Sequence, residues 1–217
     1  MWVLLLLALA PDPVVASPDS DALVIARIRY AGGGDWYNGP TEIPNLLAYV
    51  EANTTIHTAG VEARVEIGDD ALFAHPIAYL TGHGNIRLTE EEVRRLRSYL
   101  ENGGFLLAND DYGLDKAFRR EMARVFPDKD LVELPPDFGI FHTPYEFPRG
   151  LPKIHEHDNA RPQAFGIFHD GRLVVFYAFE SDIGDGWDDP DVHGDAPAAR
   201  EAALKMGTNI LVWALTH

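Results

Sequence analysis

Short β-rich runs alternate with amphipathic helical stretches along most of the 217-residue chain, and this alternation restricts the fold more than any other feature. The clearest unit begins at Thr89, whose capping box with Glu92 opens a helix. Asn102-Gly103-Gly104 ends that helix, and a strand starts at Phe105. Such βα units build a mainly parallel sheet with helices on both faces, so we expect a single three-layer α/β sandwich.

The expected elements begin at residue 22 and continue almost to the end of the chain. Strands are predicted at 22–30, 61–67, 76–81, 105–108 and 131–134, and a hairpin at 165–168 and 172–179. Helices are predicted from 41, from 90 to 101, from 115 to 127, and at the C-terminus from 197 to 215. Six prolines between 135 and 163 indicate a long irregular loop there. We expect residues 22–217 to form one domain.

Residues 1–16 have the pattern of a secretory signal peptide, with an apolar run up to Ala10 and a small residue at the cleavage position Ala16. The run is far shorter than the roughly 20 residues of a membrane-spanning helix. We therefore expect export to the periplasm or the cell exterior, without a transmembrane anchor. The alternative is a cytoplasmic protein with a disordered apolar tail.

The charge and the missing cysteines exclude several classes of function. The chain has 18 basic and 34 acidic side chains, a net charge of −16, which argues against nucleic acid and anionic membranes as partners. It contains no cysteine, so disulfides, thiolate metal ligands and thiol nucleophiles are excluded.

In parallel sheets, ligands bind beyond the carboxyl ends of the strands. Glycines on both sides of His83 allow a tight turn there that could hold an anion, a carbonyl oxygen or a metal, although His83 could equally cap the turn. Asp110 and Asp111 are suited to metal binding or base catalysis, and equally to capping turns. The candidate ligand-binding residues, including one histidine from the long loop, are Gly82, His83, Gly84, Asp110, Asp111, His142 and Asp182.

Two further clusters have weaker patterns. His155 and His157 would share one face of a strand, as a metal site needs, but their place in the irregular loop favours a solvated polar stretch. The aspartates between 182 and 195 are dense enough for calcium, yet they fit no EF-hand register.

Several of these strings together resemble one family, the domain-of-unknown-function 4159 family. They are Tyr79-Leu80-Thr81-Gly82-His83-Gly84, residues 88–92 and 96–106, and Asn109-Asp110-Asp111, with weaker similarity over nearly the whole chain after Tyr30. We expect the sandwich to be flavodoxin-like or class I glutamine amidotransferase-like, and the resemblance implies the second of these folds, often found in bacterial envelope proteins. It implies no reaction, and the amidotransferase chemistry is excluded because its nucleophile is a cysteine.

Three functions remain open, and the sequence does not decide whether the chain is an enzyme. The first is an exported binding or accessory protein of the bacterial envelope, with a polar crevice for a small polar ligand or an envelope protein. The second is a metal-dependent hydrolase of an envelope glycan, peptide or ester. In it His83, Asp110 and His142 bind a divalent cation, and Asp111 or Asp182 activates the bound water. The third is a purely structural module.

Overall fold

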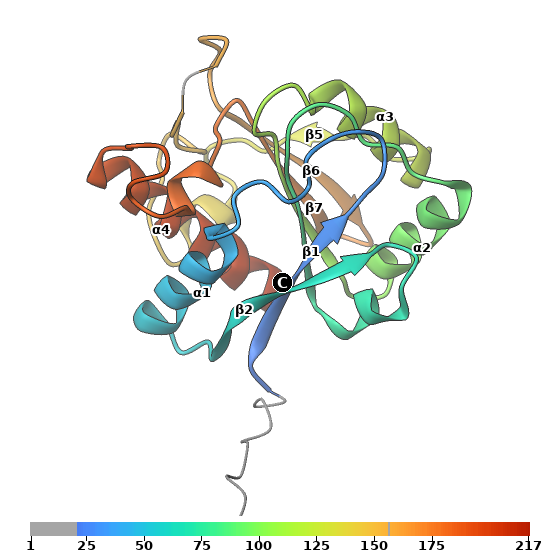
Figure 1. Cartoon of the computed structure of the whole chain (residues 1–217), viewed down its shortest axis with the longest axis horizontal. Coiled ribbons are helices and arrows are strands. Elements are labelled where there is room, and N and C mark those ends of the chain that lie inside the picture. Colours follow the sequence, from blue (N-terminus) through green and yellow to red (C-terminus); the bar gives the residue numbers. More distant parts are fainter. Residues whose placement is uncertain (1–20, 156) are drawn as a thin grey trace, which may run out of the picture.

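The computed structural model describes residues 21–155 and 157–217, and the predicted signal peptide, residues 1–16, lies outside them. Over this part of the chain, seven strands form one sheet between helices on both faces (Figure 1). The strands are β1 Leu23–Arg29, β2 Thr58–Glu66, β3 Ile77–Leu80, β4 Phe105–Asn109, β5 Val132–Glu133, β6 Gln163–His169 and β7 Arg172–Phe179. The α-helices are α1 Glu42–Asn53, α2 Glu90–Glu101, α3 Asp115–Val125 and α4 Pro197–Thr216. Short 3-10 turns are η1 Asp70–Ala74, η2 Gly139–His142 and η3 Asp185–Trp187.

The strand order is β2-β1-β3-β4-β7-β6-β5. The first five strands of this order are parallel to one another, and β6 pairs antiparallel with both β7 and β5. After β1 the chain moves outward to β2 and then returns to add β3 on the other side of β1. The boundary between β1 and β3 is therefore the point at which the strand order reverses, where open α/β sheets bind their ligands.

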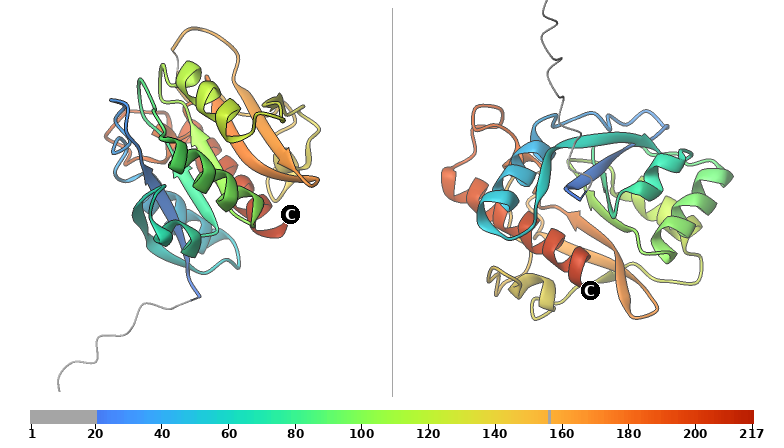
Figure 2. Two further views of the ribbon diagram at one scale, coloured as in Figure 1. Left: turned by 90° about the vertical axis from the view of Figure 1, so that its right-hand side faces the viewer. Right: turned by 90° about the horizontal axis from the view of Figure 1, so that it is seen from below.

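Each face of the sheet carries its own hydrophobic core. Helices α2 and α3 cover one face, and α1 and α4 cover the other (Figure 2). Neighbouring residues of the central strand β4 point to opposite cores: Leu106 packs on the side of α2 and α3, and Leu107 on the side of α1 and α4. Burial on both faces explains the continuous apolar runs of β3 and β4, and the predicted three-layer architecture is confirmed.

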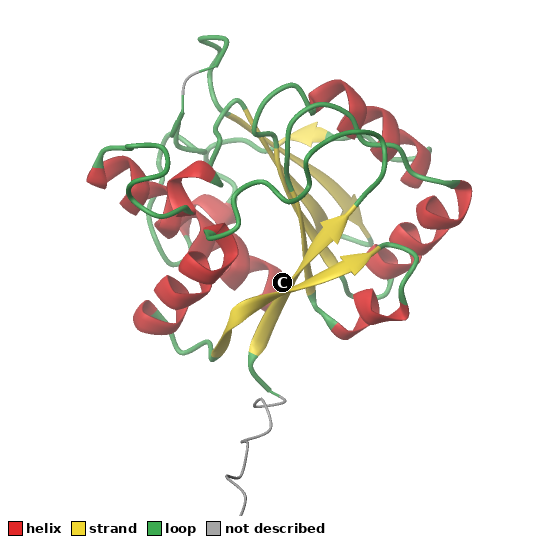
Figure 3. Cartoon of the chain, in the orientation of Figure 1, coloured by secondary structure: helices red, strands yellow, loops and turns green. Residues whose placement is uncertain are grey.

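Local signals place the ends of the elements as expected. The capping box of α2 is present, with the Glu92 amide donating to Thr89 Oγ1 at 3.2 Å and the Thr89 amide donating to Glu92 Oε2 at 2.7 Å. In the loop predicted at 135–163, the described residues form the turn η2 and otherwise no helix or strand before β6. Loops gather at the arrowhead end of the parallel strands, which we call the carboxyl edge (Figure 3).

We expect Leu106→Ala and Leu107→Ala each to lower the free energy of unfolding by about 2–5 kcal/mol, because both side chains are fully buried. Urea unfolding of the two variants measures this. A large loss in one variant only would contradict a sheet covered on both faces.

Candidate functional site

Two buried carboxylates from different loops meet at the carboxyl edge through the last residue of β4. Asn109 Nδ2 donates to Asp111 Oδ1 at 2.6 Å and to Asp182 Oδ1 at 3.2 Å. Asp111 also accepts from Thr81 Oγ1 at 2.6 Å and from Asn38 Nδ2 at 2.9 Å. Both carboxylates are 1% exposed, so side-chain donors take the place of solvent around them.

Several carboxyl groups at this edge have raised pKa values, because burial disfavours their charged form. Burial, reinforced by Asp111 and Asp185, raises the pKa of Asp182 to about 10. Burial also raises the pKa of Asp111, and it raises that of Glu42 well above the usual range. These raised pKa values follow from carboxyl groups that are buried close together with little positive charge beside them.

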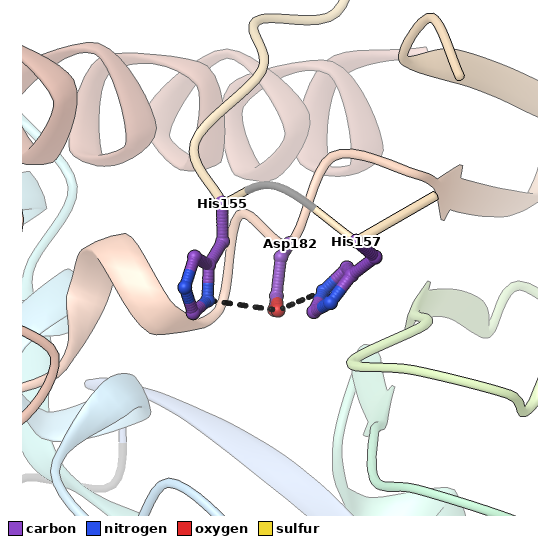
Figure 4. Close-up of side chains that lie close together, drawn as sticks. All are labelled: His155, His157 and Asp182. Carbon is purple, nitrogen blue, oxygen red and sulfur yellow. Dashed lines mark hydrogen bonds and ion pairs between the residues drawn. The ribbon is translucent and has the colours of Figure 1, made fainter. Parts of the chain in front are cut away.

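Two imidazoles flank the Asp182 carboxylate (Figure 4). His157 Nε2 lies 2.9 Å and His155 Nδ1 lies 3.9 Å from Asp182 Oδ2. The histidines come from the loop before β6, whereas Asp182 follows β7 with a positive φ of 57°. Burial and the neighbouring His155 lower the pKa of His157, which favours the neutral imidazole that metals require.

A second carboxylate and a third imidazole adjoin the same group. Asp185 Oδ2 lies 2.8 Å from His155 Nδ1 and 3.3 Å from His193 Nδ1. His193 Nε2 in turn lies 3.0 Å from Asp188 Oδ2. The ligand atoms of His155, His157 and Asp182 lie within 4.8 Å of one another, and so do those of His155, Asp185 and His193.

These separations suit a metal ion. Zinc bonds to nitrogen and oxygen of roughly 2.0–2.2 Å place two ligand atoms about 3 to 4 Å apart. Of the two separations around Asp182, 3.9 Å lies within this range and 2.9 Å lies just below it. His155 is 46% exposed, so an ion held here would remain accessible to solvent on that side.

The buried guanidinium of Arg27 in β1 organises the loop beside the site. It donates to the carbonyl oxygens of Asn38 at 2.7 Å and Gly39 at 2.8 Å, and it pairs with Glu62 and Glu42 at 2.7 and 3.3 Å. This arrangement presents the Asn38 amide to Asp111.

The predicted metal set of His83, Asp110 and His142 is not among the described side-chain groups whose ligand atoms converge within 4.8 Å. Asp110 Oδ1 accepts from the Leu114 amide at 2.8 Å, which is the turn-capping alternative. His142 lies in η2, where Glu146 and the Pro136 carbonyl contact its two ring nitrogens at 2.5 and 2.9 Å. The ring of His142 is therefore bound within its own loop and does not join His83 and Asp110 in a metal site.

The other predicted residues of the edge are Gly82, His83 and Gly84, which form the turn after β3. The backbone amide and ring Nδ1 of His83 both converge on one acceptor, as expected, but that acceptor is Asp35 of the same chain.

The solvated polar stretch favoured for His155 and His157 describes this segment only in part, because His155 is 46% exposed. The segment is not a strand, and both rings contact buried carboxylates. The two-residue spacing of His155 and His157 was the sequence signal that pointed to a metal site. The sequence pattern did not single out His193, although its partner Asp188 lies only 5 residues before it. Asp35 follows the first strand, but its pairing with His83 could not be recognised because 48 residues separate the two.

A cavity of about 720 Å³ lies elsewhere, between the loop at 85–90 and α3. Arg87, Arg120 and Glu121 are among the residues that line it. The carboxylate–imidazole cluster, which comprises His155, His157, Asp182, Asp185 and His193, contributes no lining residue. This cavity is therefore separate from the cluster at the carboxyl edge.

Comparison with known proteins gives one result. A family model described as Domain of unknown function (DUF4159) matches residues 24–215. A search of the curated proteins finds no match.

We expect Asp110→Asn to change the pH dependence of stability. Burial raises the pKa of Asp110 from 3.8 to about 6, so the folded protein binds this proton more tightly than the unfolded chain. Its stabilising contribution is fully present below pH 3.8 and is lost as the pH rises through about 6, a change of about 3 kcal/mol. Urea unfolding across this window should show that decline in the wild type and a correspondingly smaller one in the variant. Parallel profiles would contradict the buried role of Asp110.

Proposed function

Because the chain belongs to the DUF4159 family, whose description names no reaction, we propose its function from the site: the domain binds a divalent transition-metal ion through His155, His157 and Asp182. This proposal rests on the convergence of two imidazole nitrogens and one buried carboxylate, which come from separate segments of the chain.

The donor set favours zinc-like ions over calcium. Imidazole nitrogen suits zinc, iron, copper and nickel, whereas calcium takes oxygen ligands almost exclusively. A two-histidine, one-carboxylate set also leaves coordination positions open for water or another ligand. Asp185 and His193 adjoin the centre, and because Asp185 Oδ2 lies 2.8 Å from the same His155 Nδ1, Asp185 is placed as a second carboxylate ligand of that ion.

Charge supports the same proposal. Among the described residues, eight carboxyl groups and one guanidinium, that of Arg27, are buried. An ion of charge +2 would replace the proton of Asp182 and supply the positive charge that the cluster lacks.

Further proposals concern the fold and the location. The order β2-β1-β3-β4-β7 corresponds to the 2-1-3-4-5 order of flavodoxin-like sheets, which supports a flavodoxin-like fold. The signal-peptide pattern of residues 1–16 supports an exported, metal-binding accessory protein of the envelope. In the described part of the chain, no helix has the length and apolar character to cross a membrane.

We expect the purified, untagged protein to bind zinc at near 1:1 stoichiometry, measured by titration calorimetry and elemental analysis. His157→Ala and Asp182→Asn should each abolish stoichiometric binding, because each removes one of three ligands. His142→Ala is the matched control and should bind zinc normally, since Glu146 and Pro136 occupy its ring.

Two results would refute the metal centre. One is a wild-type protein that binds no zinc, cobalt or nickel. The other is equal loss of zinc in the His142→Ala and His157→Ala variants, which would indicate binding elsewhere.

A further inference from the structure

A histidine–aspartate pair stands at the point where the strand order reverses. Asp35 follows β1 and His83 follows β3, and these two strands are neighbours in the sheet. His83 Nδ1 lies 3.1 Å from Asp35 Oδ2, and the His83 backbone amide donates to Asp35 Oδ1 at 2.5 Å. Two contacts to one carboxylate fix both the backbone and the ring of His83.

Glycines make this close approach possible. Gly82 has a φ of +129°, and a Cβ there would lie 2.5 Å from the Tyr30 hydroxyl and 2.9 Å from Asp35 Oδ1. A Cβ at Gly34 would lie 2.7 Å from the His83 carbonyl oxygen. The two loops interlock so tightly that only glycine fits at either position, as is common where a structure holds a side chain in one geometry.

The pairing determines which ring nitrogen is available. A carboxylate at Nδ1 favours the proton on that nitrogen and leaves the lone pair on Nε2. The described part of the chain offers Nε2 no hydrogen bond, and the His83 side chain is 49% exposed. The imidazole is thus a fixed proton acceptor that a substrate can reach.

Tyr112 connects this pair to the carboxylate–imidazole cluster. Its backbone forms a bridge with His83, and its carbonyl oxygen accepts from the Gly84 amide at 3.4 Å. Its ring stacks on His157 with a centroid separation of 4.9 Å. Tyr112 therefore contacts both the turn that holds His83 and the proposed metal ligand His157.

We propose that His83, positioned by Asp35, is the general base of a hydrolytic reaction on a neutral acyl compound, an ester or an amide. This extends the proposed function, since the reaction would occur beside the metal centre. The Asp35 carboxylate directly beside the His83 ring repels an anionic substrate, so phosphate and sulfate esters are disfavoured.

The proton movements balance within the pair. His83 Nε2 takes a proton from water as the water oxygen bonds to the acyl carbon, and Asp35 stabilises the imidazolium. When the bond to the leaving oxygen or nitrogen breaks, the imidazolium returns the proton to that atom. No oxidant or reductant is needed.

The test uses the zinc-loaded full chain and p-nitrophenyl acetate, with bis(p-nitrophenyl) phosphate as the anionic comparison. His83→Gln should lower kcat for the acetate by roughly 100-fold, the usual contribution of a general base. The matched control is His75→Ala, which removes the histidine that precedes β3 rather than the one that follows it, and it should leave kcat unchanged. Hydrolysis of the phosphate should be much slower than that of the acetate.

A second measurement separates positioning from a purely structural role. Nitrogen NMR should show His83 with its proton on Nδ1 in the wild type, and a shift toward the other tautomer in Asp35→Asn, with zinc stoichiometry unchanged. A wild type no faster than buffer, or equal rates in wild type and His83→Gln, would overturn the proposal. If the wild-type protein does not bind zinc, that result would instead overturn the proposed metal centre.

Discussion

The carboxyl edge is organised by the cost of burying acidic groups without enough positive charge. Carboxylates that leave water must be neutralised, hydrogen-bonded or paired, and here all three occur. Asp182 holds its proton, Asp111 is bonded by Thr81, Asn38 and Asn109, and Glu42 pairs with Arg27. The imidazoles beside Asp182 and Asp185 provide further hydrogen-bond partners for these carboxylates. A bound divalent ion would also supply the positive charge that the buried carboxylates need.

The fold creates this concentration of charge by topology. The parallel strands β1, β3, β4 and β7 all end at the same edge, so the segments that follow them meet there. Arg27 anchors the segment after β1 through the Asn38 and Gly39 carbonyls, which brings Asn38 to Asp111. Two hydrophobic cores hold the strands in register, so the positions of these polar groups depend on apolar packing far from them.

Local sequence signals predicted the fold well but the site only in part. The capping box at Thr89 and the apolar run of β4 depend on neighbouring residues, so they could be recognised from sequence. The same reasoning located Asp111 and Asp182 at strand ends. It was incomplete for His155 and His142, because an irregular loop is positioned by tertiary contacts: one histidine meets Asp185, and the other meets Glu146 near η2.

The most direct test of the metal centre is a crystal structure of the zinc-loaded protein with anomalous scattering recorded at the zinc edge. The account predicts one strong peak about 2.0–2.2 Å from His155 Nδ1, His157 Nε2 and an Asp182 oxygen. A peak at other side chains, or none within reach of Asp182, would contradict it and leave a buried, protonated aspartate with no ion to bind.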